Sequence, residues 1–291
     1  YVIHFSMSPQ LFLTLVALVF VAPLTNNPFP VNVDITQKYP EIFAPLVIDQ
    51  RFSNLENKIS LIKGTFSVSI LDINTGKYYG YNDSEQYYAA SLYKLPVAIA
   101  TLNALDEDLT LDTKLSYNKE LHYYGGSGRI QGHKSGSIYT VASLLDYLIK
   151  DSDNVAQNIL EYRIGSKKVH NLASEFKLSS GFPLKSDVSS KEYLNILVGL
   201  DAGRYLSHKD TAYLLNIMAE TAFDNRISQG LDPTYSFAHK IGTWPETGSW
   251  HDCGLVYSKG KRLAVCVLSR DTTYNNSQLV AKLVGEFITA Y

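Results

Sequence analysis

A serine and a lysine three residues apart, Ser91 and Lys94, begin a stretch of chain with the apolar spacing of a helix. Side chains three positions apart on a helix lie on one face, so the amine can reach the hydroxyl. A serine hydroxyl becomes a good nucleophile when a base takes its proton, and a desolvated lysine has a lowered pKa that suits this task. The spacing alone is weak evidence, because Ser-x-x-Lys arises by chance and commonly marks an exposed helix face.

Two further groups follow along the chain. Residues 152–154 (Ser-Asp-Asn) lie between two predicted helices and offer a hydroxyl and an amide, and residues 240–243 (Lys-Ile-Gly-Thr) lie in a predicted strand and add a cation. Each group also has a simpler explanation, with Ser152 as a helix N-cap, Asn154 as a turn residue and Lys240 as a solvated strand end. The order and context of the three groups favour one shared site over three coincidences.

In this order the groups resemble the signature of the serine beta-lactamase and penicillin-binding family, which is Ser-x-x-Lys, then Ser-Asp-Asn, then Lys-Thr-Gly. The resemblance extends over residues 34–291, and residues 124–129 (Tyr-Gly-Gly-Ser-Gly-Arg) and 152–160 (Ser-Asp-Asn-Val-Ala-Gln-Asn-Ile-Leu) add to it. It implies an enzyme that acylates its own serine.

The resemblance also implies a role for each polar residue of the three groups. Ser91 would be the acylated nucleophile and Lys94 its proton acceptor. Ser152 would pass a proton to the leaving nitrogen, and Asn154 would orient both the substrate amide and Lys94. Lys240 would supply positive charge near Ser152 and the carboxylate of the substrate.

The third group departs from the family pattern at its middle position. Ile241 replaces the hydroxyl residue that helps to hold the substrate carboxylate, so Thr243, two residues on and on the same strand face, would have to replace it. Gly242 fits a place where substrate approaches a strand backbone closely. The oxyanion hole implied by the resemblance is formed by the backbone N–H groups of Ser91 and Thr243.

A second departure concerns deacylation. Class A beta-lactamases use a loop glutamate, followed by a leucine and an asparagine, to activate the hydrolytic water. In the matching region, residues 189–195 (Ser-Ser-Lys-Glu-Tyr-Leu-Asn), Glu192 stands roughly in place, but its spacing to Asn195 is one residue short. Ser189 and Glu192 also form a capping-box pattern, which we consider the better explanation. Glu192 is therefore a candidate for a catalytic role only, and turnover of the acyl-enzyme stays open.

The elements that must position these residues follow from apolar periodicity. Alternation predicts strands over residues 66–73, 78–81, 237–242, 252–257 and 262–268. Helical spacing predicts helices over residues 42–62, 91–105, 141–150, 155–162, 167–176, 209–223 and 278–290. No strand pattern is convincing between residues 106 and 231. We therefore expect an α/β (α+β) fold that is beta-lactamase-like, with a five-stranded, mainly antiparallel sheet flanked by helices and an inserted all-helical lobe.

Composition and charge limit the function classes. The 291 residues contain 26 Lys+Arg and 28 Asp+Glu, so no surplus of positive charge exists for a nucleic-acid partner. We expect one catalytic domain over residues 34–291, divided into a sheet lobe (34–105 and 232–291) and a helical lobe (106–231). A small-molecule substrate is expected in the cleft between the lobes, and we expect a monomer.

The first 33 residues contain no charged side chain, and residues 11–22 are almost entirely apolar. This run is short for a bilayer span but typical of an export signal. We expect residues 1–33 to be an export signal or a membrane anchor through residues 1–24, followed by a linker, and the enzyme to act outside the cytoplasm. The alternative is a buried N-terminal helix.

The two cysteines lie on the strands of the last predicted hairpin. A turn centred on Lys259 and Gly260 pairs Cys253 with Cys266 directly across the hairpin. A disulfide is geometrically possible and an exported location permits it, whereas two reduced, packed cysteines are an equal alternative. The seven histidines show no metal-ligand spacing, so we expect neither a metal nor another cofactor.

The sequence therefore predicts an exported serine hydrolase that opens beta-lactam rings through a Ser91 acyl-enzyme, with an apolar wall for the substrate at Tyr123 and Tyr124. One alternative is a D,D-peptidase or transpeptidase relative that acts on cell-wall peptides. Another is a binding module of the same fold that has lost turnover, which the unusual Ile241 and the uncertain Glu192 would both allow.

Overall fold

The computed structural model describes residues 49–258 and 260–291. The predicted export segment and linker at residues 1–33, and the first part of the predicted helix over residues 42–62, lie outside the described residues. Within the described ranges, no helix combines the length and the apolar character that crossing a bilayer requires.

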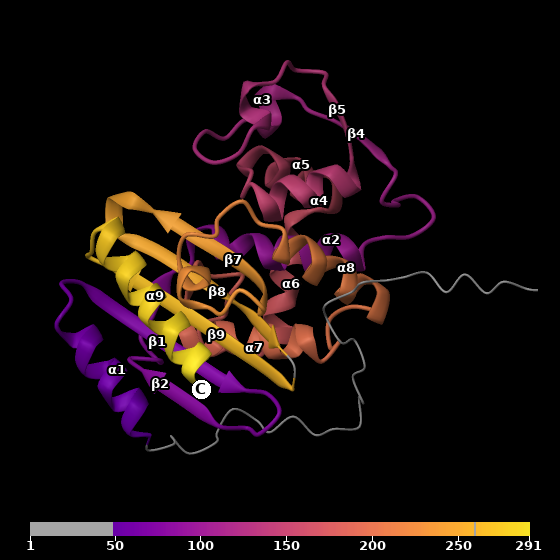
Figure 1. The fold of residues 1–291 in the computed structure, drawn as a ribbon. Helices are drawn as coiled ribbons and strands as arrows, with labels where there is room; N and C mark the ends of the chain where they lie inside the picture. The colour runs from indigo at the N-terminus through magenta and orange to yellow at the C-terminus, as the bar shows by residue number, and fades with distance from the viewer. Residues whose placement is uncertain (1–48, 259) are drawn as a thin grey trace, which may run out of the picture.

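A five-stranded antiparallel sheet built from both ends of the chain forms the centre of the fold, as predicted (Figure 1). Ser258 lies opposite Lys261, so the turn between the last two strands sets the register that the sequence predicts. In spatial order the strands are β2 (Tyr78–Tyr81), β1 (Thr65–Asp72), β9 (Lys261–Arg270), β8 (Ser249–Ser258) and β7 (Ser236–Trp244).

Helices cover both faces of this sheet. On the first, called the α9 face, α1 (Gln50–Ser60) and α9 (Tyr274–Ala290) pack on apolar side chains of the strands (Figure 1). On the second, called the α7 face, α7 (Ser190–Asp201) packs on β1, β8 and β9. The larger core continues from the α7 face into α2 (Lys94–Asn103), α4 (Val141–Lys150), α5 (Asn154–Ile164), α6 (Ser166–Phe176) and α8 (His208–Ala219), whereas the short helix α3 (Lys119–His122) contacts α5 outside this core.

Helix α7 was not among the predicted helices. Ten of its twelve residues are buried, because the helix lies between the sheet and the other helices. A helix that is buried nearly all round has no polar face, and hence no apolar period that a sequence pattern can detect.

Four short strands were also missed. They form two separate two-stranded ladders, β3 (Tyr87–Tyr88) with β6 (Asp187–Val188) and β4 (Lys114–Ser116) with β5 (Ile138–Thr140). Two or three residues are too few to establish alternation, so the expectation of no strand between residues 106 and 231 was wrong.

The packing links the two predicted lobes. α2, within the predicted sheet lobe, packs against α4, α5 and α6, whereas α7, within the predicted helical lobe, packs on the sheet. The lobe boundaries stay a prediction.

Candidate active site

The nucleophile candidate Ser91 lies in a short 3-10 helix (Ala90–Tyr93) that leads directly into α2. Lys94 begins α2 and is 2% exposed. Its Nζ donates hydrogen bonds to Ser91 Oγ at 2.9 Å and to Asn154 Oδ1 at 2.7 Å. Burial lowers the pKa of Lys94 to about 8, although Asp153 and Glu161 act against it. A lysine with this pKa is partly neutral at neutral pH, so it can take a proton from the adjacent hydroxyl.

The backbone just before Ser91 is held in an unusual conformation. Ala90 has a φ of 48°, in the left-handed region that residues with a Cβ rarely adopt. Two bonds fix the turn from outside: Ala89 N–H donates to Ser186 O at 2.8 Å, and the Tyr193 hydroxyl donates to Leu92 O at 3.1 Å. Strain of this kind persists where the surroundings determine it, and it is common at functional sites.

The second group connects the helical part of the molecule to Lys94. Asp153, and not Ser152, caps α5, with Oδ1 accepting from Val155 N–H and Ala156 N–H. Its other oxygen accepts from the backbone N–H groups of residues 129 and 130, so this buried carboxylate ties the loop over residues 125–130 to the start of α5. Asn154 Nδ2 donates to Gly125 O at 2.8 Å, which turns its Oδ1 toward Lys94.

The third group is a buried cation rather than a solvated strand end. Lys240 on β7 is 1% exposed, and its Nζ donates to Ser152 Oγ at 2.9 Å and to Ile241 O at 3.0 Å. Burial moves its pKa well below the usual value, and the nearby cations Lys94 and Arg226 lower it further. The structure therefore brings Ser91, Lys94, Ser152, Asn154 and Lys240 together, while their roles stay predictions.

Arg226 is a site residue that sequence reasoning missed. It is 3% exposed, and its guanidinium donates to Thr243 Oγ1 at 2.6 Å, to Gly242 O at 3.1 Å and to His251 O. Burial lowers its pKa, opposed chiefly by Asp252. Its sequence neighbours show no pattern that separates it from an exposed loop arginine, so no local signal could have identified it.

The residues after Lys240 depart in part from expectation. A Cβ on Gly242 would lie 2.8 Å from Ala89 O, so the missing side chain admits the backbone just before Ser91. Thr243 is half-buried, and its hydroxyl oxygen accepts from Arg226. Ile241 is buried. The binding roles of Gly242 and Thr243 stay predictions.

Glu192 forms the predicted capping box with Ser189 at the start of α7. Its carboxylate accepts from Gln86 Nε2, Ser179 Oγ, Ser180 N–H and Ser189 N–H, all between 2.8 and 3.0 Å. Burial alone would raise its pKa, but these donors lower it to about 2. The capping-box interpretation is confirmed. The deacylating role of Glu192 stays a prediction, and its carboxylate already accepts hydrogen bonds from structural donors.

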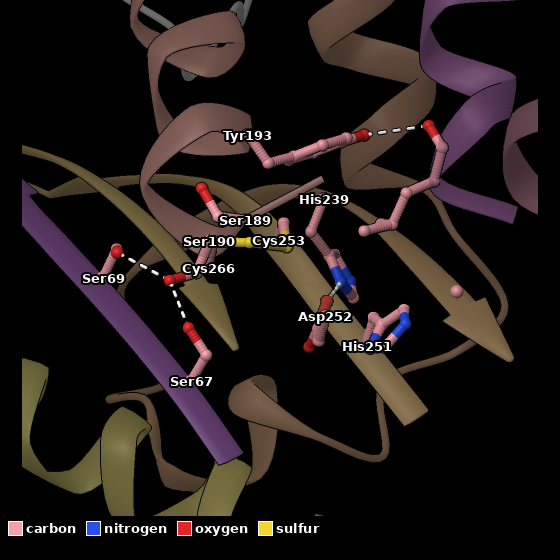
Figure 2. Close-up of a disulfide and its surroundings, with 12 residues drawn as sticks. Ser67, Ser69, Ser189, Ser190, Tyr193, His239, His251, Asp252, Cys253 and Cys266 are labelled. Atoms are coloured by element: carbon pink, nitrogen blue, oxygen red, sulfur yellow. Dashed lines mark hydrogen bonds and ion pairs between the residues drawn. A yellow bond between two sulfur atoms is a disulfide. The ribbon is translucent and has the colours of Figure 1, made fainter. Parts of the chain in front are cut away.

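A disulfide joins Cys253 and Cys266, which lie directly opposite each other as predicted (Figure 2). In register, Lys240 lies opposite Cys253 and Ser69 lies opposite Cys266. The disulfide therefore occupies the sheet row that ends at Lys240. In the same region of the α7 face, Ser190 Oγ is hydrogen-bonded to Ser67 Oγ and Ser69 Oγ at 2.6 and 2.7 Å (Figure 2).

Exposed aromatic rings occur near the nucleophile in sequence and on β7. Tyr88, three residues before Ser91, contacts Trp244 edge-on at 5.9 Å between ring centres. Tyr123 and Tyr124, the predicted wall, are both about half exposed. Their contact with substrate stays a prediction.

Comparison with known proteins identifies the family of this chain. The chain matches the model of the beta-lactamase enzyme family over residues 48–290. It is 25% identical to beta-lactamase SME-1 of Serratia marcescens over 217 residues, which cover 68% of this chain and 73% of that protein. It is 29% identical to beta-lactamase ROB-1 of Haemophilus influenzae over 152 residues, which cover 50% of this chain and 44% of that one.

Solved structures show the same fold. The structure of PBP-A is 20% identical, with a TM-score of 0.76 over 84% of this chain and 97% of that one. The TLA-3 extended-spectrum beta-lactamase is 21% identical, with a TM-score of 0.75 over 84% and 98%. Since the family model matches most of the chain and the three motif groups converge in space, the chain belongs to the beta-lactamase enzyme family.

Proposed function

We propose that this protein opens beta-lactam rings and forms an acyl-enzyme at Ser91. The observation that carries the proposal is the contact of 2.9 Å between Lys94 Nζ and Ser91 Oγ, in a setting where burial lowers the pKa of the lysine to about 8. A nucleophile and a base within hydrogen-bond reach are the minimum apparatus of covalent catalysis. Asn154 adds the orienting group that such a base requires.

In the proposed acylation, one proton leaves the Ser91 hydroxyl and another is delivered to the ring nitrogen. Ser91 Oγ attacks the lactam carbonyl carbon while its proton passes to Lys94 Nζ. When the carbon–nitrogen bond breaks, the ring nitrogen takes a proton from Ser152 Oγ, and Ser152 Oγ takes one in turn from Lys240 Nζ, 2.9 Å away, so that Lys94 ends protonated and Lys240 neutral. The backbone N–H groups of Ser91 and Thr243 would receive the charge that develops on the carbonyl oxygen.

The substrate carboxylate would bind near Thr243. The Thr243 oxygen accepts a hydrogen bond from Arg226, so its own proton is free to be donated outward. Lys240 and Arg226 supply positive charge within the same wall. This arrangement compensates for Ile241, because the hydroxyl moves two residues along the strand and an arginine orients it.

A second candidate follows from Glu192. Because its carboxylate accepts five hydrogen bonds from structural donors, Ser189 Oγ included, it is poorly placed to activate a water, which favours a long-lived acyl-enzyme of the penicillin-binding type. A mutant of PBP-A, 21% identical with a TM-score of 0.74, forms an acyl-enzyme complex with penicillin G. The alternative is therefore a D,D-peptidase or transpeptidase that acts on cell-wall peptides.

One experiment separates these functions. Purified protein is mixed with a chromogenic cephalosporin and with a labelled penicillin, beside a Ser91→Ala variant and a Ser84→Ala control, which removes a hydroxyl bonded at the surface. Turnover that Ser91→Ala abolishes supports the lactamase. Labelling of Ser91 without turnover supports the peptidase, and an absence of both in the wild-type protein would overturn both enzymatic functions.

We also propose that the enzyme acts outside the cytoplasm, on the basis of the uncharged, apolar residues 1–33. The test expresses the whole chain in a bacterial host beside a chain that starts at Asp34. Recovery of both in the cytosolic fraction would contradict export.

A further inference from the structure

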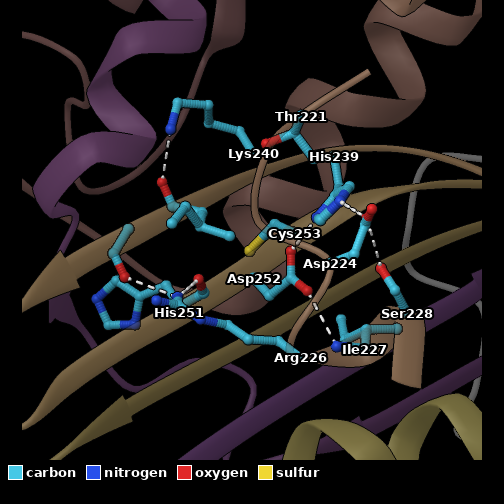
Figure 3. Close-up of polar contacts among 12 residues, drawn as sticks. Thr221, Asp224, Arg226, Ile227, Ser228, His239, Lys240, His251, Asp252 and Cys253 are labelled. Carbon is cyan, nitrogen blue, oxygen red and sulfur yellow. Dashed lines mark hydrogen bonds and ion pairs between the residues drawn. The ribbon is translucent and has the colours of Figure 1, made fainter. Parts of the chain in front are cut away.

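Directly behind Lys240, on the α9 face of β7, lies a charge network that the acylation chemistry does not use, in which His239 and Asp252 are buried and Asp224 is exposed (Figure 3). His239 is 1% exposed, and its Nδ1 lies 2.6 Å from Asp252 Oδ1. Its Nε2 forms an ion pair with Asp224 Oδ1 at 3.7 Å. Both neighbours are carboxylates, whereas the buried Lys240 on the other face contacts a hydroxyl and a carbonyl.

Asp252 connects His239 to the segment that carries Arg226. The second oxygen of Asp252 accepts from Ile227 N–H at 3.1 Å, one residue after Arg226 (Figure 3). Asp224, two residues before Arg226, is held by His239 on one side and by Ser228 Oγ at 3.5 Å on the other. His239 thus binds the segment over residues 224–228 on both sides of the arginine.

We propose that His239 is a positioning residue, which fixes this segment through Asp252 and Asp224 so that Arg226 orients the Thr243 hydroxyl toward the carboxylate of the substrate. The inference rests on the proposed function for its substrate, but the placement of Arg226 can be measured without any turnover.

The electrostatics agree with this geometry. Burial would lower the pKa of His239, but Asp252 and Asp224 outweigh burial and raise it. The protonated ring donates from Nδ1 to Asp252, while its Nε2 faces the carboxylate of Asp224 at 3.7 Å, an ion pair that is too long for a hydrogen bond. The groups that face the ring are these two carboxylates, the stacked ring of Phe237 at 4.1 Å and, beyond Asp252, the guanidinium of Arg226.

The first measurement observes Arg226 directly. In protein labelled with ¹⁵N in its arginine side chains, the Arg226 N–H signals are assigned by their loss in Arg226→Lys. His239→Asn places an amide N–H close to the position of Nδ1 and keeps the bond to Asp252, whereas His239→Leu removes every donor. We expect the Arg226 signals to be retained in His239→Asn and to shift or broaden in His239→Leu. If His239→Leu does not fold, His239→Gln is used instead, because the extra methylene group of glutamine moves the amide donors away from the position of Nδ1.

The second measurement uses a penicillin and its carboxyl methyl ester as matched substrates. A weakened hydrogen bond to a charged group predicts that His239→Leu raises KM for the acid about tenfold, leaves kcat nearly unchanged and spares the ester. His239→Asn should restore most of the affinity. Because Arg226→Gln removes the same bond, adding it to His239→Leu should cause little further loss.

Two results would overturn the inference: unchanged Arg226 signals in both His239→Leu and His239→Gln, or equal losses of the acid and the ester. Failure of the proposed function gives a different pattern. The wild-type protein would then react with neither substrate, while the Arg226 signals would still report whether His239 positions the arginine.

Discussion

Two neighbouring residues of β7, Lys240 and His239, place buried charge on opposite faces of the same strand, and their surroundings differ in one respect. Both are 1% exposed. Lys240 bonds to a hydroxyl and a carbonyl, and burial moves its pKa well below normal. His239 lies between two carboxylates, and its pKa is raised. The charge of His239 is therefore balanced by carboxylates of the protein, whereas Lys240 has no directly bonded carboxylate.

This difference indicates the side of β7 on which an anionic ligand would bind. A buried cation without an anionic partner destabilises a fold by several kcal/mol, because its desolvation is not repaid. On the α7 side of β7, Lys94 and Lys240 both lack a directly bonded carboxylate. An anionic substrate would supply that missing charge, whereas His239 already lies beside two carboxylates of the protein.

The largest expected effect tests whether the uncompensated face is chemical. Lys94→Met removes the base while keeping the length of the side chain, and we expect acylation by a penicillin to slow by about 10²–10⁴-fold. Rapid-mixing measurements of covalent labelling report this rate directly. Lys150→Met, which removes a lysine ion-paired at the surface, is the control. An unchanged rate in Lys94→Met would remove this lysine from the mechanism.

A pH profile sharpens the same comparison. Burial lowers the pKa of Lys94 to about 8, so the neutral, proton-accepting form grows as pH rises through 8. Below that value the acylation rate should rise about tenfold per pH unit, and above it the rate should level off. The measurement is the labelling rate between pH 5.5 and 9.5. A profile that falls through this range, or that stays flat, contradicts a lysine base.

A smaller effect is expected where Thr243 stands in for the absent hydroxyl at Ile241. Thr243→Val preserves the shape of the side chain and removes the donor, so KM for a substrate with a free carboxylate should rise about tenfold. The methyl ester of the same substrate is the control and should lose little affinity. Equal losses for both substrates would mean that Thr243 supports the strand rather than the carboxylate.

Residue spacing alone could predict those parts of the molecule in which the two partners are close in the sequence. Ser91 and Lys94 share one helical turn, and Cys253 and Cys266 share one hairpin, so spacing alone places each pair. The sheet was predicted from the alternation of side chains along strands whose two faces are covered by different helices. Helix α7 was not predicted, because it is buried nearly all round and therefore has no apolar period.

The long-range contacts of Lys94 with Asn154 and of Lys240 with Ser152 were expected only from the family resemblance, and long-range pairs outside that resemblance were beyond prediction. Arg226 meets Thr243 only because β7 returns past the segment over residues 224–228, and no local pattern marks either contact. His239 and Asp252 are diagonal neighbours across β7 and β8, with His239 opposite Gly254 and Ile241 opposite Asp252. Such a pair becomes visible only when the register is known, and the register does not reveal that Asp252 also holds Ile227.

The smallest effect on catalysis is expected at Glu192, the carboxylate at the start of the helix that covers the α7 face. Its donors lower its pKa to about 2 from the usual 4.5. A depressed carboxyl pKa contributes stability that is complete above about pH 4.5 and is lost as pH falls toward 2. Glu192→Gln should therefore lower the free energy of unfolding by about 2 kcal/mol at pH 7, and this difference should shrink below pH 4.5.

The same variant separates the two enzymatic functions. If Glu192 serves α7 alone, its acylation rate and any deacylation rate stay within about twofold of wild type, as substitutions outside the reacting groups usually allow. Denaturant unfolding at pH 7, 5 and 3.5 measures the stability difference, with Glu246→Gln, an exposed carboxylate, as the control. A collapse of deacylation with intact acylation would instead make Glu192 the water-activating base. The α7 face would then hold a catalytic carboxylate of its own, and the contrast with the α9 face would depend on Lys240 alone.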